Sequence, residues 1–155
     1  MTDGCDLWDR TQEAGRGVVA AFDRVLGAPS DRTRVAAAPE LLRAVRAFLT
    51  LRLVAVTGDR RRAFPLSVPP AGRETVAALW AEVFWAARTQ AEDDDSGVLE
   101  ATDASIRGLL ALEPADLARR ESVRAWRERL AAVEETFAGL EVQAQAALDV
   151  RREAF

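Results

Sequence analysis

Histidine, lysine, tyrosine and asparagine are all absent from the sequence, and isoleucine occurs only once. Histidine is the commonest acid–base side chain near neutral pH and the commonest zinc ligand. Its absence excludes catalysis by Ser–His or Cys–His pairs. All 21 basic residues are arginine and alanine occupies 31 positions, a bias that is typical of a GC-rich bacterial genome. Selection against lysine, as an escape from lysine-directed tagging, would produce the same absence.

Cysteine and long apolar runs are also scarce. Cys5 is the only cysteine, so it cannot close an intramolecular disulfide, and its place near the N-terminus argues against a firmly held nucleophile. No stretch approaches the ~20 apolar residues that span a bilayer. The first residues are acidic where a signal peptide would be basic. We therefore expect a cytoplasmic chain that makes no membrane contact.

The residues that are present suffice for one folded domain over residues 1–155. Hydrophobic residues make up 49% of the chain and charged residues 30%, which is ordinary for a globular protein. A chain of this length can bury a core without disulfides or metals. We expect no cofactor.

The first helix is predicted over residues 5–26. Its apolar residues recur at alternating steps of three and four, and Trp8, Phe22 and Leu26 widen the stripe. Gly27 supplies a C-terminal stop. A short turn capped by the Ser30 hydroxyl is expected to follow.

The second helix is predicted to begin at Pro39, because proline suits a first helical position, and to end at Gly58. One face of this helix carries Leu42, Val45, Leu49, Leu53 and Val56. The third helix should run from the end of the Pro-Pro-Ala-Gly segment at 69–72 to about Gln90. Apolar residues surround most of it: Val76, Leu79, Trp80, Val83, Phe84 and Trp85. Such a helix must be covered on nearly all sides, by its own chain or by a second copy.

A weaker helix is predicted over residues 98–112, since Gly108 lowers its propensity. The last helix is predicted to be continuous from Val123 to Ala147, with Gly139 on its solvent side. Its heptad seam consists of Val123, Trp126, Leu130, Val133, Phe137, Leu140, Ala144 and Ala147. Arg129 and Glu134 occupy g and e positions, where opposite charges can pair between two parallel helices.

Strand patterning occurs only at residues 64–68, where Pro65 interrupts it. The fold class is therefore all-α. We predict an antiparallel helical bundle of four to five helices, with a long heptad-patterned C-terminal helix packed in coiled-coil fashion.

Four adjacent carboxylates at residues 92–95 suggest a divalent-cation site, because Mg²⁺ and Ca²⁺ prefer carboxylate oxygens. Two Glu-x-x-Asp spacings would each place two acids on one helical face. This hypothesis names as ligands Glu92, Asp95, Glu100 and Asp103. The all-α nucleotide pyrophosphatase family pairs such a unit with an upstream Glu-x-x-Glu, which is missing here; Glu74 and Glu82 are the acids available on a facing helix. A solvated acidic loop is the simpler interpretation.

A long loop at residues 57–72 and two tryptophans suggest a protein-binding surface. Arginine clamps around apolar anchors would bind a partner, whereas a loop lying across the bundle end would only seal the core. Trp80 and Trp85 are five residues apart and point to different sides, so at least one must meet a second surface. The residues predicted to bind a partner are Arg60, Arg61, Arg62, Phe64, Trp80 and Trp85.

Charge is divided between the two halves of the chain, +3 over residues 1–78 and −7 over residues 79–155. A molecule with one net positive and one net negative half is a poor candidate for nucleic-acid binding. In general appearance the chain resembles small helical accessory proteins encoded beside larger effectors in bacterial conflict or biosynthetic operons. We therefore predict a non-enzymatic interaction module whose partner is a larger protein or a second copy of the chain. The alternatives are a metal-dependent carboxylate enzyme acting on a phosphorylated small molecule and a bundle enclosing an apolar ligand.

Overall fold

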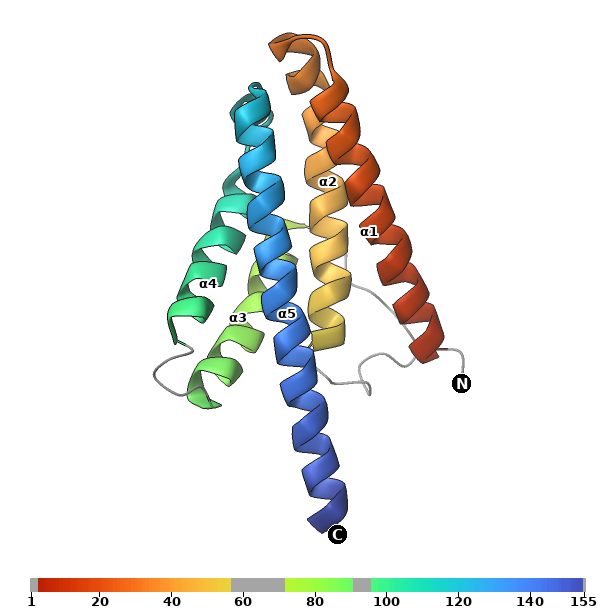
Figure 1. The fold of residues 1–155 in the computed structure, drawn as a ribbon, viewed down its shortest axis with the longest axis vertical. Coiled ribbons are helices and arrows are strands. Elements are labelled where there is room, and N and C mark those ends of the chain that lie inside the picture. The colour runs from red at the N-terminus through yellow and green to blue at the C-terminus, as the bar shows by residue number, and fades with distance from the viewer. Residues whose placement is uncertain (1–2, 57–71, 91–95, 155) are drawn as a thin grey trace.

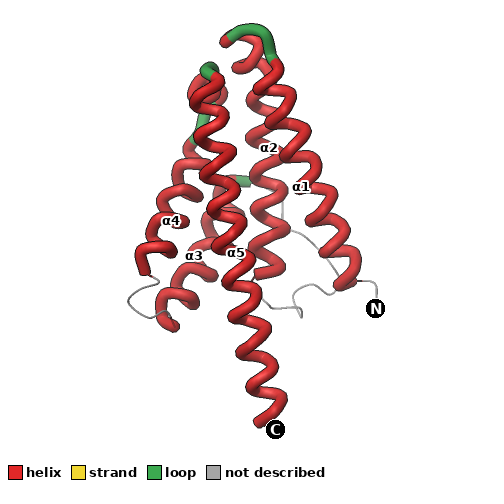
Figure 2. The backbone as a smooth tube through the Cα atoms, in the orientation of Figure 1, coloured by secondary structure: helices red, strands yellow, loops and turns green. Residues whose placement is uncertain are grey.

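The computed structural model describes residues 3–56, 72–90 and 96–154, and all of its regular structure is helical. The elements are α1 (Asp3–Gly27), α2 (Asp31–Val56), α3 (Arg73–Gln90), α4 (Ser96–Ala111), the short 3-10 helix η3 (Pro114–Leu117) and α5 (Arg120–Ala154). No strand occurs in the described ranges (Figure 2). The prediction of an all-α bundle of four to five helices is confirmed.

Helices that follow one another in sequence run in opposite directions at three places, α1 to α2, α3 to α4 and α4 to α5 (Figure 1). Across the middle of the bundle, α2 and α5 run in the same direction. Helix α2 contacts α1, α3, α5 and η3, and α5 contacts α1, α2, α4 and η3, so these two helices form the centre of the bundle. All five residues of its predicted apolar face are buried, and Leu41, Phe48 and Leu51 are buried with them.

The start of α2 differs from the prediction, because the helix begins at Asp31 and contains Pro39 in its interior. Ser30 and Thr33 cap this start reciprocally: the Thr33 amide donates to the Ser30 hydroxyl (3.2 Å) and the Ser30 amide donates to the Thr33 hydroxyl (3.0 Å). The expected Ser30 cap is therefore present. It opens a long helix instead of a short turn, since the buried side chain of Arg34 also anchors the first turns.

Helix α3 lies at the edge of the bundle, where it packs on α2 and α4. The chain itself does not cover α3 on nearly all sides, and cover by a second copy, the other alternative, stays a prediction. Three of its six large apolar residues are buried, Val76, Trp80 and Val83, and Leu79 and Phe84 are half-buried. Trp85 alone is exposed. The part of α3 that could meet another chain is thus narrower than the sequence indicates.

Helix α5 is continuous over its whole length, which confirms the predicted uninterrupted helix from Val123 to Ala147. Val123, Leu130, Val133 and Phe137 are buried in the core, and Gly139 is exposed as expected. The C-terminal part of α5 projects past the ends of the other helices (Figure 1).

Gly108 on α4 permits a close approach of Trp126 from α5. A Cβ atom at position 108 would lie 2.4 Å from the Cη2 atom of the Trp126 ring. The Trp126 ring also contacts Arg129, whose guanidinium lies 4.5 Å from the ring centroid. The glycine that lowers the helix propensity of α4 therefore provides the space for an α4–α5 contact.

Opposite effects are expected for two Gly→Ala substitutions. Gly108→Ala should lower the free energy of unfolding by about 1 kcal/mol, because overpacking against Trp126 outweighs the gain in helix propensity. Gly139→Ala, where a Cβ atom meets nothing within 4 Å, should raise it by about 0.5–1 kcal/mol. Urea denaturation of the two variants measures both changes, and a stabilised Gly108→Ala variant would contradict the packing described here.

Candidate interaction surface

Large apolar side chains are exposed mainly at one end of the bundle. The N-terminal end of α1, the C-terminal end of α3 and the N-terminal end of α4 all lie at the end from which α5 projects, with α1 on the opposite side of α2 and α5 from α3 and α4 (Figure 1). These segments carry Trp8 (64% exposed), Trp85 (64%) and Val98 (55%), and α5 contributes Val142 (69%). We call these four residues the apolar end. Among the residues whose side-chain exposure the structure describes, Val19 on α1 is the only other large apolar one of comparable exposure, at 50%.

Trp85 is supported by a row of aromatic rings that leads into the core. Phe137, fully buried on α5, lies 5.8 Å from Trp80, and Trp80 lies 5.8 Å from Phe84, measured between ring centroids. Phe84 in turn meets Trp85 edge to face at 5.5 Å. Each contact has a spacing typical of favourable aromatic pairs. The exposed Trp85 indole therefore packs on Phe84, and the row of ring contacts restricts its motion.

Polar contacts hold the same part of α3 against α4. The indole N–H of Trp80 donates to Asp103 (2.9 Å), and Arg88 pairs with Glu100 (3.1 Å). The Arg88 guanidinium also lies 5.8 Å from the centre of the Phe84 ring. These contacts fix the α3–α4 hairpin on which Trp85 stands.

The residues predicted to bind a partner differ in their exposure and in whether the structure describes them. Trp80 is 3% exposed, so it cannot touch a partner in this conformation, whereas Trp85 faces outward. The prediction that the two indoles point to different sides is thus confirmed. Four other predicted residues lie outside the described residues: Arg60, Arg61, Arg62 and Phe64. Trp8 was expected to widen the buried stripe of the first helix, which is wrong, since the core-facing line of α1 runs through Val18, Phe22 and Val25.

The acids proposed as metal ligands do not converge in the described part of the chain. Glu100 is paired with Arg88, and Asp103 accepts from Trp80 and pairs with Arg107 (3.0 Å). Glu92 and Asp95 lie outside the described residues. No group of three or more potential ligands occurs among those residues that are described. The metal-site hypothesis thus remains a prediction without geometric support.

Charges between α2 and α5 follow the heptad spacing of α5. Arg52 of α2 pairs with Glu141 (2.8 Å), and Glu134, one heptad earlier on α5, lies half-buried near the same arginine. Burial raises the pKa of Glu134 above its ordinary value, and the positive charge of Arg52 opposes that rise only in part. Arg129 stacks on Trp126. The predicted pairing of Arg129 and Glu134 between two chains stays a prediction.

The chain matches no protein-family model, and comparison with curated proteins and with solved structures finds no significant similarity. Within the described ranges, no helix combines the length and apolar character that crossing a bilayer requires.

Proposed function

We propose that this chain is a non-enzymatic helical interaction module that docks on a larger protein through the apolar end. The observation that carries the proposal is Trp85, an indole that is 64% exposed and yet packs on Phe84, which a row of two further rings connects to the core. Rigid, exposed tryptophan is favoured at the energetic centre of protein interfaces. The absence of histidine from the sequence agrees with a role other than acid–base catalysis.

The shape of this end also favours docking. The projecting part of α5 extends beyond the apolar end and offers a second element against which a partner can pack (Figure 1). Helix-mediated recognition of this kind buries one apolar helix face in a groove of the partner. The general resemblance to accessory proteins of bacterial conflict and biosynthetic operons points to a larger effector as that partner. A second copy, paired along α5 in coiled-coil fashion, is the alternative occupant.

Trp85→Glu is expected to weaken the complex by about 30-fold or more, as replacement of an interface tryptophan typically does. Because Trp85 is exposed, the variant should keep the helical circular dichroism of the wild type. Val19→Glu is the matched control, since it introduces the same charge at an exposed apolar site away from the apolar end. Sedimentation and light scattering at micromolar concentrations, with and without the partner recovered from the source cells, measure the association.

Two outcomes contradict the proposal. One is a monomer at every concentration from which no stoichiometric partner can be recovered. The other is a complex that Trp85→Glu and Val19→Glu weaken equally. A concentration-dependent dimer sensitive only to Trp85→Glu would identify a second copy as the occupant.

A further inference from the structure

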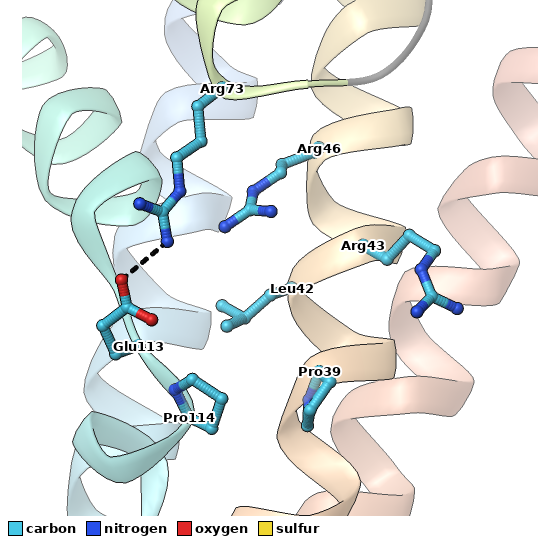
Figure 3. A pocket seen from close by; sticks show the side chains of 7 residues that line it. All are labelled: Pro39, Leu42, Arg43, Arg46, Arg73, Glu113 and Pro114. Atoms are coloured by element: carbon cyan, nitrogen blue, oxygen red, sulfur yellow. Dashed lines mark hydrogen bonds and ion pairs between the residues drawn. The ribbon is translucent and has the colours of Figure 1, made fainter.

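An arginine-lined pocket lies in a part of the bundle that the proposed function does not use. It is open to solvent, has a volume of about 590 Å³ and lies between α2, the first residue of α3 and the connection from α4 to η3 (Figure 3). Its charged residues are Arg43, Arg46, Arg73 and Glu113. Two of these cations, Arg46 and Arg73, face the Glu113 carboxylate, which leaves an excess of one positive charge at the centre of the pocket.

The two arginines nearest to Glu113, Arg46 and Arg73, differ in the hydrogen bonds that their guanidinium groups make. Arg73 donates to the Glu113 carboxylate (2.9 Å) and to the Leu112 carbonyl (3.4 Å). Arg46 points toward the same space, whereas Arg43 points away from it (Figure 3). The Nε atom of Arg46 is buried and has no hydrogen-bond partner within the described part of the chain. Burial and the charge of Arg73 lower the pKa of Arg46, while Glu113 raises it, so this guanidinium lies in a net unfavourable environment.

A buried donor without a partner is costly, and structures that retain one commonly reserve it for a ligand or a water. An added anion between Arg46 and Arg73 would accept hydrogen bonds from the terminal nitrogens of the two guanidiniums, lower the cost of the crowded Arg46 charge and relieve the repulsion between the two groups. Paired arginines recognise the oxygens of phosphate and carboxylate groups with particular strength.

The remaining walls of the pocket are apolar: Pro39, Leu42 and Pro114. The two proline rings are rigid and present flat surfaces beside the cationic region. A volume of about 590 Å³ falls in the range of small-molecule sites. The lining therefore suits a compact organic molecule with an anionic head and an apolar body.

We propose that this pocket binds the phosphate monoester group of a small organic molecule, with the phosphate between Arg46 and Arg73 and the organic body against the two prolines and Leu42. A phosphate monoester carries about −1.5 to −2 charges at neutral pH, which matches the two positive charges of Arg46 and Arg73 once Glu113 is displaced. Glu113 is a resident counterion that the phosphate must displace from Arg73. The site is independent of the proposed docking surface, since Trp85 lies about 18 Å along α3 from Arg73.

Calorimetric titration with phenyl phosphate tests the site, with inorganic phosphate and benzoate as the comparison probes at constant ionic strength. Phenyl phosphate should bind saturably, and at least about threefold more tightly than either comparison probe. Inorganic phosphate lacks the apolar body, and benzoate carries only one charge. Equal affinity for all three probes, or no saturation by phenyl phosphate at millimolar concentration, would overturn the proposal.

Variants separate this site from a general attraction of anions. Arg46→Gln and Arg73→Gln should each weaken phenyl phosphate binding at least about tenfold, as expected for the loss of a charged hydrogen-bond donor. Glu113→Gln should tighten binding about threefold or more, because it removes the competing carboxylate. Arg32→Gln, an equal charge change at an exposed position of α2, should leave binding unchanged.

The gain expected for Glu113→Gln keeps the test decisive even where an arginine variant fails to fold, which circular dichroism would reveal. Weaker binding by Glu113→Gln would overturn the proposal. An equal loss in Arg32→Gln and Arg46→Gln would do so as well, since it would show that only the overall charge matters.

Discussion

Replacing Arg34 with methionine is expected to lower the free energy of unfolding by about 3 kcal/mol. The Arg34 side chain is buried and joins three parts of the chain. Its Nε atom donates to the Ala118 carbonyl (2.6 Å), one terminal nitrogen donates to the Ala28 carbonyl (2.9 Å), and the other pairs with Asp31. Methionine retains much of the apolar stem but leaves both carbonyls without their donor.

The exposed neighbour Arg32 provides the control, since Arg32→Met should change stability by less than about 0.5 kcal/mol. Urea denaturation measures the difference in free energy of unfolding between the two variants. The comparison is direct when the dependence of that free energy on urea concentration is the same for both. Arg34→Lys should recover only part of the loss, because a single ammonium cannot reproduce the fork that reaches Ala28 and Ala118 together. An Arg34→Met variant as stable as Arg32→Met would show that these bonds are not formed in solution.

The predicted helices were recovered where apolar periodicity and local end signals agree. Gly27 predicted the end of α1, and the Pro-Pro-Ala-Gly segment at 69–72 predicted the start of α3. The long heptad seam predicted the continuous α5, and all three helices lie close to their predicted bounds. The start of α2 was missed because proline at a first helical position is a statistical preference, whereas the observed start is stabilised by Arg34 and a residue 84 positions away. Nothing in the sequence distinguishes Arg34 from the other 20 arginines.

Periodicity also does not reveal which helix is central. The widths of the apolar faces of α2 and α3 indicate how much of each helix surface must be buried. They do not indicate which neighbouring helix buries it. The six large apolar residues of α3 suggested a helix enclosed on all sides. In the structure α3 buries three of them, Val76, Trp80 and Val83, and Trp85 stays exposed. The exposure of Trp85 follows from its angular offset from Trp80, which the sequence does contain.

The arginine-lined pocket shows the opposite case, a site with no sequence signal. Arg46 and Arg73 come from two helices, and Glu113 follows a third. None of the three belongs to a cluster or a recognisable spacing. Their convergence depends on how α2, α3 and the α4–η3 connection pack, so only tertiary structure could bring the site to notice.

Phe137→Ala is expected to lower the free energy of unfolding by about 3–5 kcal/mol, the usual range for removing a fully buried aromatic ring. Phe137 is the last fully buried residue of the α5 seam between Val123 and Leu140, and its ring supports Trp80. Loss of that support should also loosen Phe84 and Trp85 farther along the row. Near-ultraviolet circular dichroism, which reports the fixed environment of aromatic rings, should therefore weaken even under conditions where the variant remains folded.

Leu140→Ala, one turn farther along the same seam, tests where the core ends. Leu140 is half-buried, so the isolated chain should lose less than about 2 kcal/mol, clearly less than with Phe137→Ala. The comparison should be made at several protein concentrations, because a partner copy that packs on the projecting part of α5 would bury Leu140 more completely. A Leu140→Ala loss as large as that of Phe137→Ala and independent of concentration would contradict a core that ends near Phe137. A loss that grows with concentration would instead place a second copy of the chain along this helix.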